Sequence, residues 1–170
     1  MFEWCSLHPS DSKDLVDLQV HKHSTTCRKK GHPICRFVFP LPPFNNTVIL
    51  EPLETNVEKY KALYKEVQNK IDSIYDMENA ENVTFDKLLH NVVEINEDKY
   101  IKVIRSSLNG PKVFLKRKPS EVRVNPYMKV VLSAWKSNHD LQFVLDPYAC
   151  AMYIVSYISK YQKGMSALLE

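Results

Sequence analysis

The sequence predicts a single α+β domain, in which several helices and short strands follow a Cys/His-rich loop near the N-terminus. Two observations predict this class: apolar residues recur at helical spacing in the middle of the chain, and short β-branched or aromatic runs lie on both sides of it. At 170 residues with 44% hydrophobic content, the chain can bury one sizeable core. We divide it into a Cys/His-rich segment with short strands (1–50), an acidic helical insertion (51–108), and basic strands followed by a final helix (109–170).

Five short strands are expected. Residues 36–39 and 47–50 combine β-branched and aromatic side chains, and a proline-rich turn at residues 40–43 separates them. The other three strands are predicted at residues 113–117, 122–124 and 141–145.

Most of the acidic insertion is predicted to be helical. Thr55 and Glu58 have the spacing of a capping box, and the apolar residues that follow recur every three or four positions as far as Tyr75. Three shorter helices are predicted along the chain, at residues 84–92, 96–108 and 127–136.

A final helix has clear boundary signals. Asp146 is a good N-cap, Pro147 suits the first helical position, and Gly164 suits the residue just past the end. A four-residue spacing aligns three tyrosines along one stripe: Tyr153, Tyr157 and Tyr161. Aromatic side chains at this spacing usually belong to a core. The other interpretation is a DNA strand-transfer enzyme, in which neighbouring phenols act as nucleophiles beside the Lys160 ammonium.

Charge is unevenly distributed along the chain, although the formal net charge is only +3. Residues 51–100 carry twelve acids against six lysines (net −6), whereas residues 111–137 carry seven bases against one acid (net +6). The basic stretch is a candidate surface for a single-stranded DNA backbone, the alternative being an ordinary solvated strand face. Its candidate contacts are Lys112, Lys116, Arg117, Lys118 and Arg123, with Tyr127 or Trp135 to stack on bases.

Five candidate metal ligands fall within the fifteen residues from His21 to Cys35. Zinc prefers four thiolate or imidazole ligands in a tetrahedron, and the set predicted for a structural zinc site is His21, His23, Cys27 and Cys35. The alternative is a loop with unligated cysteines. Four cysteines, without a signal-peptide pattern or a run apolar enough to span a membrane, favour a nuclear or cytoplasmic protein over a secreted disulfide scaffold.

The run His21-Lys22-His23 has a second interpretation. On a strand, residues i and i+2 face the same side, so two histidines separated by one residue can grip one catalytic metal ion. Here the middle residue is a lysine and the three residues that follow are polar. We therefore favour zinc ligation or simple exposure for this pair.

Three stretches of the chain together resemble one family. They are His21-Lys-His-Ser-x-x-Cys27 with Cys35-Arg-Phe-Val-Phe-Pro40-Leu-Pro-Pro43, then Asn109-Gly-Pro-Lys-Val-Phe-Leu-Lys-Arg-Lys118, and then Asn138-His-Asp-Leu-Gln-Phe-Val-Leu-Asp-Pro147 continued by Tyr153-Ile-Val-Ser-Tyr157-Ile-Ser-Lys160. Over almost its whole length, the chain resembles the replication-initiator domain, also labelled helitron helicase-like, of Helitron rolling-circle transposon proteins.

The resemblance implies a DNA nicking and joining enzyme of the His-hydrophobic-His type, fused in full-length proteins to a Pif-type helicase and acting on single-stranded DNA. It also implies that Tyr153 and Tyr157 are the paired nucleophiles and that Lys160 neutralises charge beside them, whereas Tyr161 does not match the pair. One tyrosine attacks a phosphodiester and retains a 5′-phosphotyrosine. A divalent cation, Mg²⁺ or Mn²⁺, polarises the phosphate in the complete enzyme. No membrane and no small-molecule substrate are expected.

The chain also departs from the family pattern. The family's histidine pair lies in an apolar strand upstream of the Cys/His cluster, and neither such a strand nor a GxxxxGK[ST] phosphate-binding loop is found. We therefore expect a partial His-hydrophobic-His endonuclease-like domain, a fragment that carries the tyrosines and a DNA-binding surface without the cation ligands or the helicase. One alternative is a non-catalytic, zinc-dependent nucleic-acid-binding module. Another is a protein-interaction domain that acts through the acidic helices.

Overall fold

The computed structural model describes residues 13–28, 35–139, 141 and 143–166, with side chains to residue 159. It has an α+β fold, as predicted, with six helices and a two-stranded sheet among the described residues. The elements in order are α1 (Lys13–Asp17), β1 (Val48–Leu50), α2 (Val57–Ile74), η3 (Ala80–Asn82), α3 (Phe85–Lys87), η4 (Leu88–Val93), α4 (Glu97–Arg105), β2 (Lys112–Phe114), η5 (Pro119–Glu121), α5 (Lys129–Trp135) and α6 (Pro147–Ser166). None of the described helices is long and apolar enough to cross a membrane.

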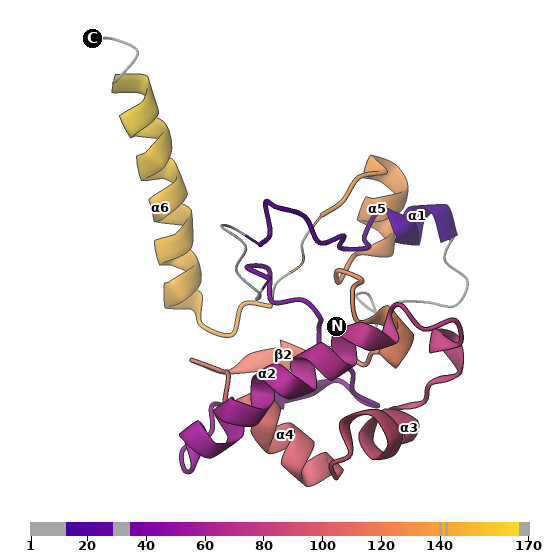
Figure 1. Cartoon of the computed structure of the whole chain (residues 1–170). Coiled ribbons are helices and arrows are strands. Elements are labelled where there is room, and N and C mark those ends of the chain that lie inside the picture. Colours follow the sequence, from indigo (N-terminus) through magenta and orange to yellow (C-terminus); the bar gives the residue numbers. More distant parts are fainter. Residues whose placement is uncertain (1–12, 29–34, 140, 142, 167–170) are drawn as a thin grey trace.

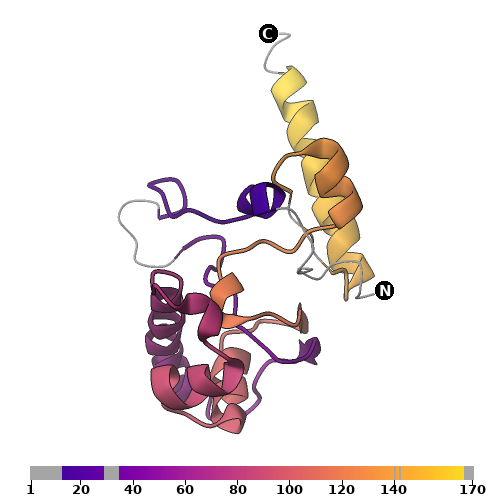
Figure 2. The ribbon, with the colours of Figure 1, turned by 90° about the vertical axis from the view of Figure 1, so that its right-hand side faces the viewer.

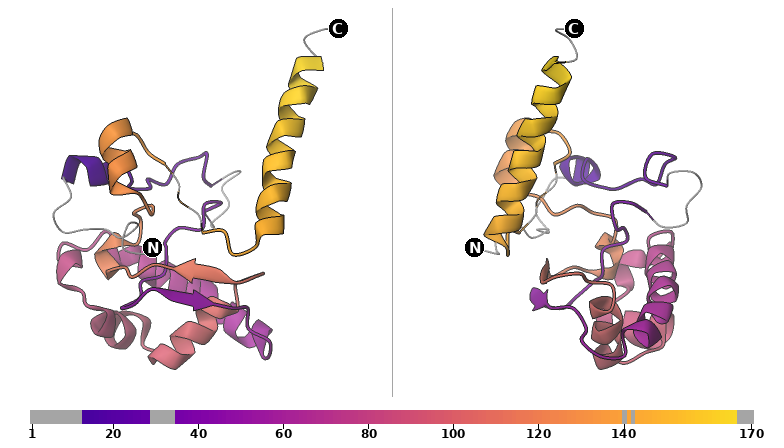
Figure 3. Two further views of the ribbon diagram at one scale, coloured as in Figure 1. Left: turned by 180° about the vertical axis from the view of Figure 1, so that it is seen from behind. Right: turned by 90° about the vertical axis from the view of Figure 1, so that its left-hand side faces the viewer.

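The main body packs α2, α3 and α4 against the small sheet (Figure 1). Strands β1 and β2 run antiparallel, with Val48 opposite Phe114 and Leu50 opposite Lys112. An isolated bridge between Phe44 and Arg117 continues this pairing beyond the strands. The view from behind in Figure 3 shows the sheet in front of α2, so the helices cover one of its faces.

Aromatic side chains fill the centre of the main core. Phe44 lies between Phe85, Tyr100 and Phe114, with ring centroids 5.4–6.3 Å apart. Such pairs contribute about 0.5–1.5 kcal/mol each beyond the burial of their area. The fully buried Tyr100 also donates its hydroxyl proton to the carbonyl of Pro43 at 3.2 Å. This bond holds the proline turn, and with it the segment that leads back to the Cys/His cluster, against α4.

A smaller cluster joins α1 to α5, and Figure 2 shows these two helices apart from the main body. Leu15, Val16 and Val20 pack on the buried side chains of Val124, Tyr127 and Leu132. Gln19 is fully buried there: its Nε2 donates to the carbonyl of Ser137 at 3.2 Å, and its backbone carbonyl accepts from Asn125 at 2.9 Å. The segment before the cluster residue His21 is therefore fixed by side-chain bonds as well as by apolar contacts.

The predicted helices are present, with changed ends. Asn56, in a left-handed conformation, replaces the expected Thr55 cap of α2, and its side chain makes no capping bond. Helix α4 ends at Arg105 instead of residue 108, and residues 84–92 form two short turns, α3 and η4, of which η4 is a π-helix. Helix α5 starts at Lys129, and α6 continues through Gly164 to Ser166. The Asp146 cap is confirmed, because its Oδ1 accepts from the amides of Tyr148 and Ala149 at 2.9 and 3.2 Å.

Three of the predicted strands are wrong or shortened for a local reason. Residues 36–39 turn instead of extending, because Val38 has a φ of 63° and its amide donates to the Cys35 carbonyl. Residues 122–124 follow the helical turn η5, and only Val124 pairs, in an isolated bridge with Val20. The strand predicted at 113–117 covers only Lys112–Phe114. The described residues of the last predicted strand, 141–145, do not form a strand either.

Arg117 explains why the chain turns after β2. Its side chain is 6% exposed, and its Nη1 donates to the carbonyls of Glu121 and Val124, which curls the intervening residues around the guanidinium. Burial lowers the pKa of Arg117 to about 10, so the side chain remains charged at neutral pH. Arg117 thus stabilises this turn from inside the protein.

Replacing Arg117 with methionine should therefore destabilise the fold. The Glu121 and Val124 carbonyls would lose a charged donor, and we expect the free energy of unfolding to fall by about 1–3 kcal/mol. Urea denaturation followed by circular dichroism measures this change. The control is Lys116→Met, since Lys116 is exposed. An Arg117→Met protein as stable as the wild type would contradict the internal role.

Candidate metal centre

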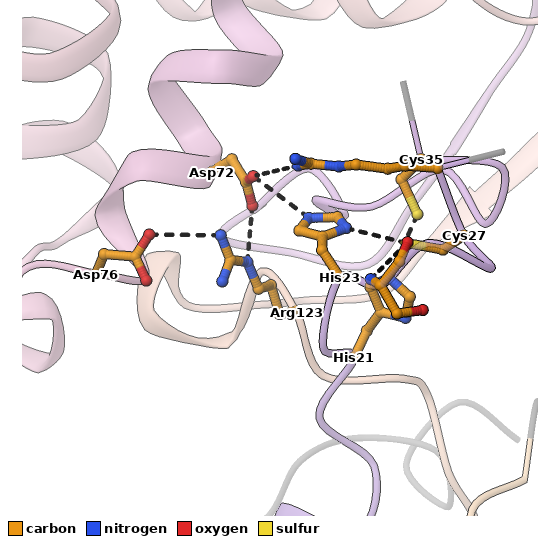
Figure 4. A network of polar contacts seen from close by, with 9 residues as sticks. His21, His23, Cys27, Cys35, Asp72, Asp76 and Arg123 are labelled. Atoms are coloured by element: carbon orange, nitrogen blue, oxygen red, sulfur yellow. Dashed lines mark hydrogen bonds and ion pairs between the residues drawn. The ribbon is translucent and has the colours of Figure 1, made fainter. Parts of the chain in front are cut away.

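Four side chains converge on one point between the main body and the α1–α5 cluster. The ligand atoms of His21, His23, Cys27 and Cys35 all lie within 4.8 Å of one another. Two pairs face each other closely, Cys27 Sγ with His23 Nδ1 at 3.5 Å and Cys35 Sγ with His21 Nε2 at 3.3 Å (Figure 4). In a tetrahedral zinc site, bond lengths of about 2.0–2.3 Å place neighbouring ligands about 3.3–3.8 Å apart. The cluster could therefore hold a metal ion such as zinc.

A tight turn positions the first thiol. Cys27 donates its amide proton to the carbonyl of Ser24 at 3.2 Å, and the Ser24 amide points back at Cys27 Sγ, also at 3.2 Å. The Cys27 thiol also donates to the Ser24 carbonyl at 3.2 Å, so this turn fixes the position of the sulfur. Two more backbone bonds fix the flanks: His21 donates to the Arg123 carbonyl at 2.7 Å, and Arg36 donates to the Cys27 carbonyl at 3.0 Å.

The protonation states also suit metal binding. Cys27 and Cys35 are buried, at 1% and 3% exposure, and both are free thiols. Burial, aided by nearby positive charge, lowers the pKa of His21 and of His23 below the usual value of 6.5. The imidazoles are therefore neutral at pH 7 and each has a lone pair to offer.

An aspartate on α2 lies behind the cluster. His23 Nε2, on the opposite side of its ring from the thiol, is 3.4 Å from Asp72 Oδ2. The Nε2 atom of His23 is buried, and it makes no hydrogen bond to any of the described residues. Asp72 is itself held by Arg123, whose Nε donates to Oδ1 at 2.8 Å, while Arg28 lies 3.9 Å away. Arg123 extends the network to Asp76, with its Nη2 atom 3.5 Å from Asp76 Oδ2 (Figure 4).

The strand that the catalytic interpretation of the histidine pair requires is not formed in the described residues. His21 and His23 are not on a strand, and each faces a thiol. Soft sulfur neighbours suit zinc better than a hard cation such as Mg²⁺. The fifth candidate ligand, His32, lies outside the described residues.

The predicted DNA-contacting side chains divide into two groups. Lys112, Lys116 and Lys118 are exposed. Arg117 is interior, and Arg123 is only 13% exposed and bonded to Asp72, so we remove both from the predicted DNA surface. Tyr127, proposed to stack on bases, is buried at 1% exposure, whereas Trp135 is 75% exposed.

The tyrosine helix does not belong to the core. Tyr153 and Tyr157 are 62% and 56% exposed, and their ring centroids lie 4.8 Å apart at 49°. Helix α6 projects away from the sheet and from α2 (Figure 1), and from Tyr148 to Ser159 only Cys150 is partly buried. The prediction that aromatic spacing marks a core face is therefore wrong here. The side chains of Lys160 and Tyr161 lie outside the described part of the chain.

Sequence reasoning missed two features of this region. Asp72 is one of twelve acids in the insertion, and no spacing distinguishes it from the others. Phe37 and Phe39 were assigned to a strand, yet both flank the His21 ring, with centroids at 5.7 and 4.4 Å. Both rings come close to His21 because the chain turns at Val38. The β-branched and aromatic residues of this segment favour a strand, so the sequence does not indicate the turn.

Comparison of the chain with protein-family models, with curated proteins and with solved structures found no match in any of the three. A function therefore has to be inferred from the chemistry of the cluster and its surroundings.

Proposed function

We propose that this chain is a zinc-organised module that binds single-stranded DNA. The observation that carries the proposal is the convergence of two imidazoles and two buried thiols to within 4.8 Å. This donor set is typical of structural zinc, which takes four protein ligands and leaves no open position.

The local packing supports a structural role for the metal. Around the cluster, the buried apolar contacts are few: Cys27, Cys35 and Phe39, with Leu41 packed beside them. Residues 21–28 and 35–43 contain no helix or strand. A zinc ion that joins their ends supplies folding free energy that so small an apolar cluster lacks.

Metal analysis tests the site. We expect about one zinc ion per purified chain, and we expect Cys27→Ser and Cys35→Ser to lose most of it, because each removes a thiolate. The matched control is Cys150→Ser on α6, which should retain the wild-type content. Plasma mass spectrometry gives the stoichiometry. Unchanged zinc in both cluster variants would contradict the proposal.

Asp72 is assigned as the outer partner of the zinc ligand His23. A ligating histidine usually donates its second N–H to a carboxylate, which fixes its tautomer and orients the ring. Here Nδ1 faces Cys27 and Nε2 faces Asp72. The carboxylate therefore keeps the ring proton on Nε2 and leaves Nδ1 as the nitrogen that binds zinc.

Asp72→Asn should therefore weaken zinc binding about 10- to 100-fold. Competition with a chromophoric chelator measures the affinity. Asp76→Asn is the control, since Asp76 binds the same Arg123 without reaching the histidine, and it should remain near wild type. Equal affinities in the two variants would refute the role of Asp72.

A second candidate activity is the Helitron-type nicking and joining implied by the resemblance. Its support is the exposure and mutual contact of Tyr153 and Tyr157, which are accessible to a strand. In that reaction a tyrosine oxygen bonds to phosphorus, the P–O3′ bond breaks, and the phenolic proton passes to the leaving 3′ oxygen. The Mg²⁺ or Mn²⁺ of this chemistry has no assigned ligands among the described residues.

This activity predicts a covalent product. Single-stranded DNA incubated with the chain and Mn²⁺ should give an adduct on a denaturing gel, and Tyr153→Phe/Tyr157→Phe should abolish it. Tyr148→Phe is the control, because Tyr148 is exposed on the same helix. Salt-sensitive binding with no adduct would exclude the candidate and leave the binding module.

A further inference from the structure

A groove runs beside the metal centre. It has a volume of about 610 Å³ and is lined by residues from 36–42, by residues 111–115 around β2, and by Asn125, Pro126, Asn138, Leu141 and Phe143. Its described lining contains two exposed cations, Arg36 and Lys112, and no acidic side chain, although the chain as a whole carries 20 acids. Arg117 also borders the groove but is buried against backbone carbonyls, and His21 is neutral, so neither adds an exposed charge. The helices of the acidic insertion, whose negative charge would repel a polyanion, contribute no residue to the described lining. The field inside the groove therefore favours an anion.

The groove also offers faces on which a base can stack. Phe37 is 48% exposed at its wall, and the Arg36 guanidinium lies over that ring, 4.5 Å from the centroid. Lys112 and the amides of Asn125 and Asn138 also line the groove. Aromatic rings interleaved with cations are the pattern by which proteins bind single strands, with bases on the rings and phosphates on the cations.

We propose that this groove binds single-stranded DNA, with a base on Phe37 and the backbone near Arg36 and Lys112. The inference rests on the proposed function and gives it a place in the fold. A duplex is a poor occupant, because its bases are already stacked and present no free face. An apolar peptide is disfavoured as well, since it would remove the Arg36 and Lys112 side chains from water.

The metal centre supports one wall of this groove. His21 stacks on Phe39 with centroids 4.4 Å apart and 6° between planes, and it meets Phe37 edge-on at 5.7 Å. The same ring directs Nε2 at Cys35. A zinc ion bound through Nε2 fixes the ring, and the ring fixes the two phenylalanines. DNA affinity should therefore depend on zinc without the ion touching DNA.

Fluorescence anisotropy with a labelled oligothymidine tests the groove on the full, zinc-loaded chain. Phe37→Ala should weaken binding roughly 5- to 150-fold, the loss expected for one stacked base. Tyr148→Ala is the control: this aromatic is 75% exposed on α6 and does not line the groove, so its loss should leave affinity unchanged. Cobalt substitution spectra, identical in all variants, would show that the metal centre is intact.

Zinc removal provides the second arm. Chelation should weaken binding by the wild type about as much as Phe37→Ala does, and should weaken the Phe37→Ala variant little further. Arg36→Gln should reduce the salt dependence of binding by about one phosphate contact. These results together support the groove and its link to zinc.

Three outcomes overturn the inference. Wild-type affinity in both Phe37→Ala and Arg36→Gln, with a loss in Lys116→Gln/Lys118→Gln, would move binding to the lysine surface and leave the proposed function standing. Absence of DNA binding by the zinc-loaded wild type would reject the proposed function and the groove together. Tighter binding of the matched oligouridine or of duplex DNA would reject the choice of ligand.

Discussion

The arrangement of this protein depends on one carboxylate. Asp72, near the end of α2, is 3.4 Å from His23 in the metal cluster and 2.8 Å from Arg123 in the segment after β2. Three parts of the chain that are distant in sequence therefore meet at a single side chain. The Arg123 guanidinium also lies over the Tyr75 ring, with its Cζ 4.4 Å from the ring centroid, so it packs against the C-terminal end of α2. This junction adds charged side-chain contacts to the backbone bonds that join the Cys/His segment to residues 122 and 123.

The arginines and the lysines of the basic stretch differ in their burial. The sequence places seven bases between residues 111 and 137, and a charge count treats them as one surface. In the structure, Arg117 is used to bind carbonyls and Arg123 to bind Asp72, because a buried guanidinium with several acceptors fastens turns well. The lysines remain outside, since a flexible stem keeps their ammonium groups in water. Candidate DNA contacts are therefore fewer, and of the three candidate lysines only Lys112 borders the groove, whose described lining is free of acids.

Periodicity and ligand chemistry predicted what depends on neighbours in sequence. The extent of α2 and the Asp146 cap follow from spacing within one turn, and the structure confirms both. The four Cys/His side chains predicted as zinc ligands also come together, in a cluster that could hold a metal ion. The strands at 36–39 and 122–124 failed because their backbone groups bond within turns set by Cys35 and by Arg117. The spacing of Tyr153 and Tyr157 could not decide whether they are core or exposed, since periodicity reports one face of a helix and not what covers it. Asp72 escaped prediction for a similar reason: its partners come from residues 49 and 51 positions away.

The central claim is that a single zinc ion, held by two imidazoles and two thiolates, organises the segment beside the groove. X-ray absorption at the zinc edge of the full chain tests it most directly, because it counts ligands around the metal whatever the ion does to DNA binding. We expect two sulfur atoms at about 2.3 Å and two nitrogen atoms at about 2.0–2.1 Å. A shell made only of nitrogen and oxygen, or a zinc ion with a single sulfur neighbour, would contradict it.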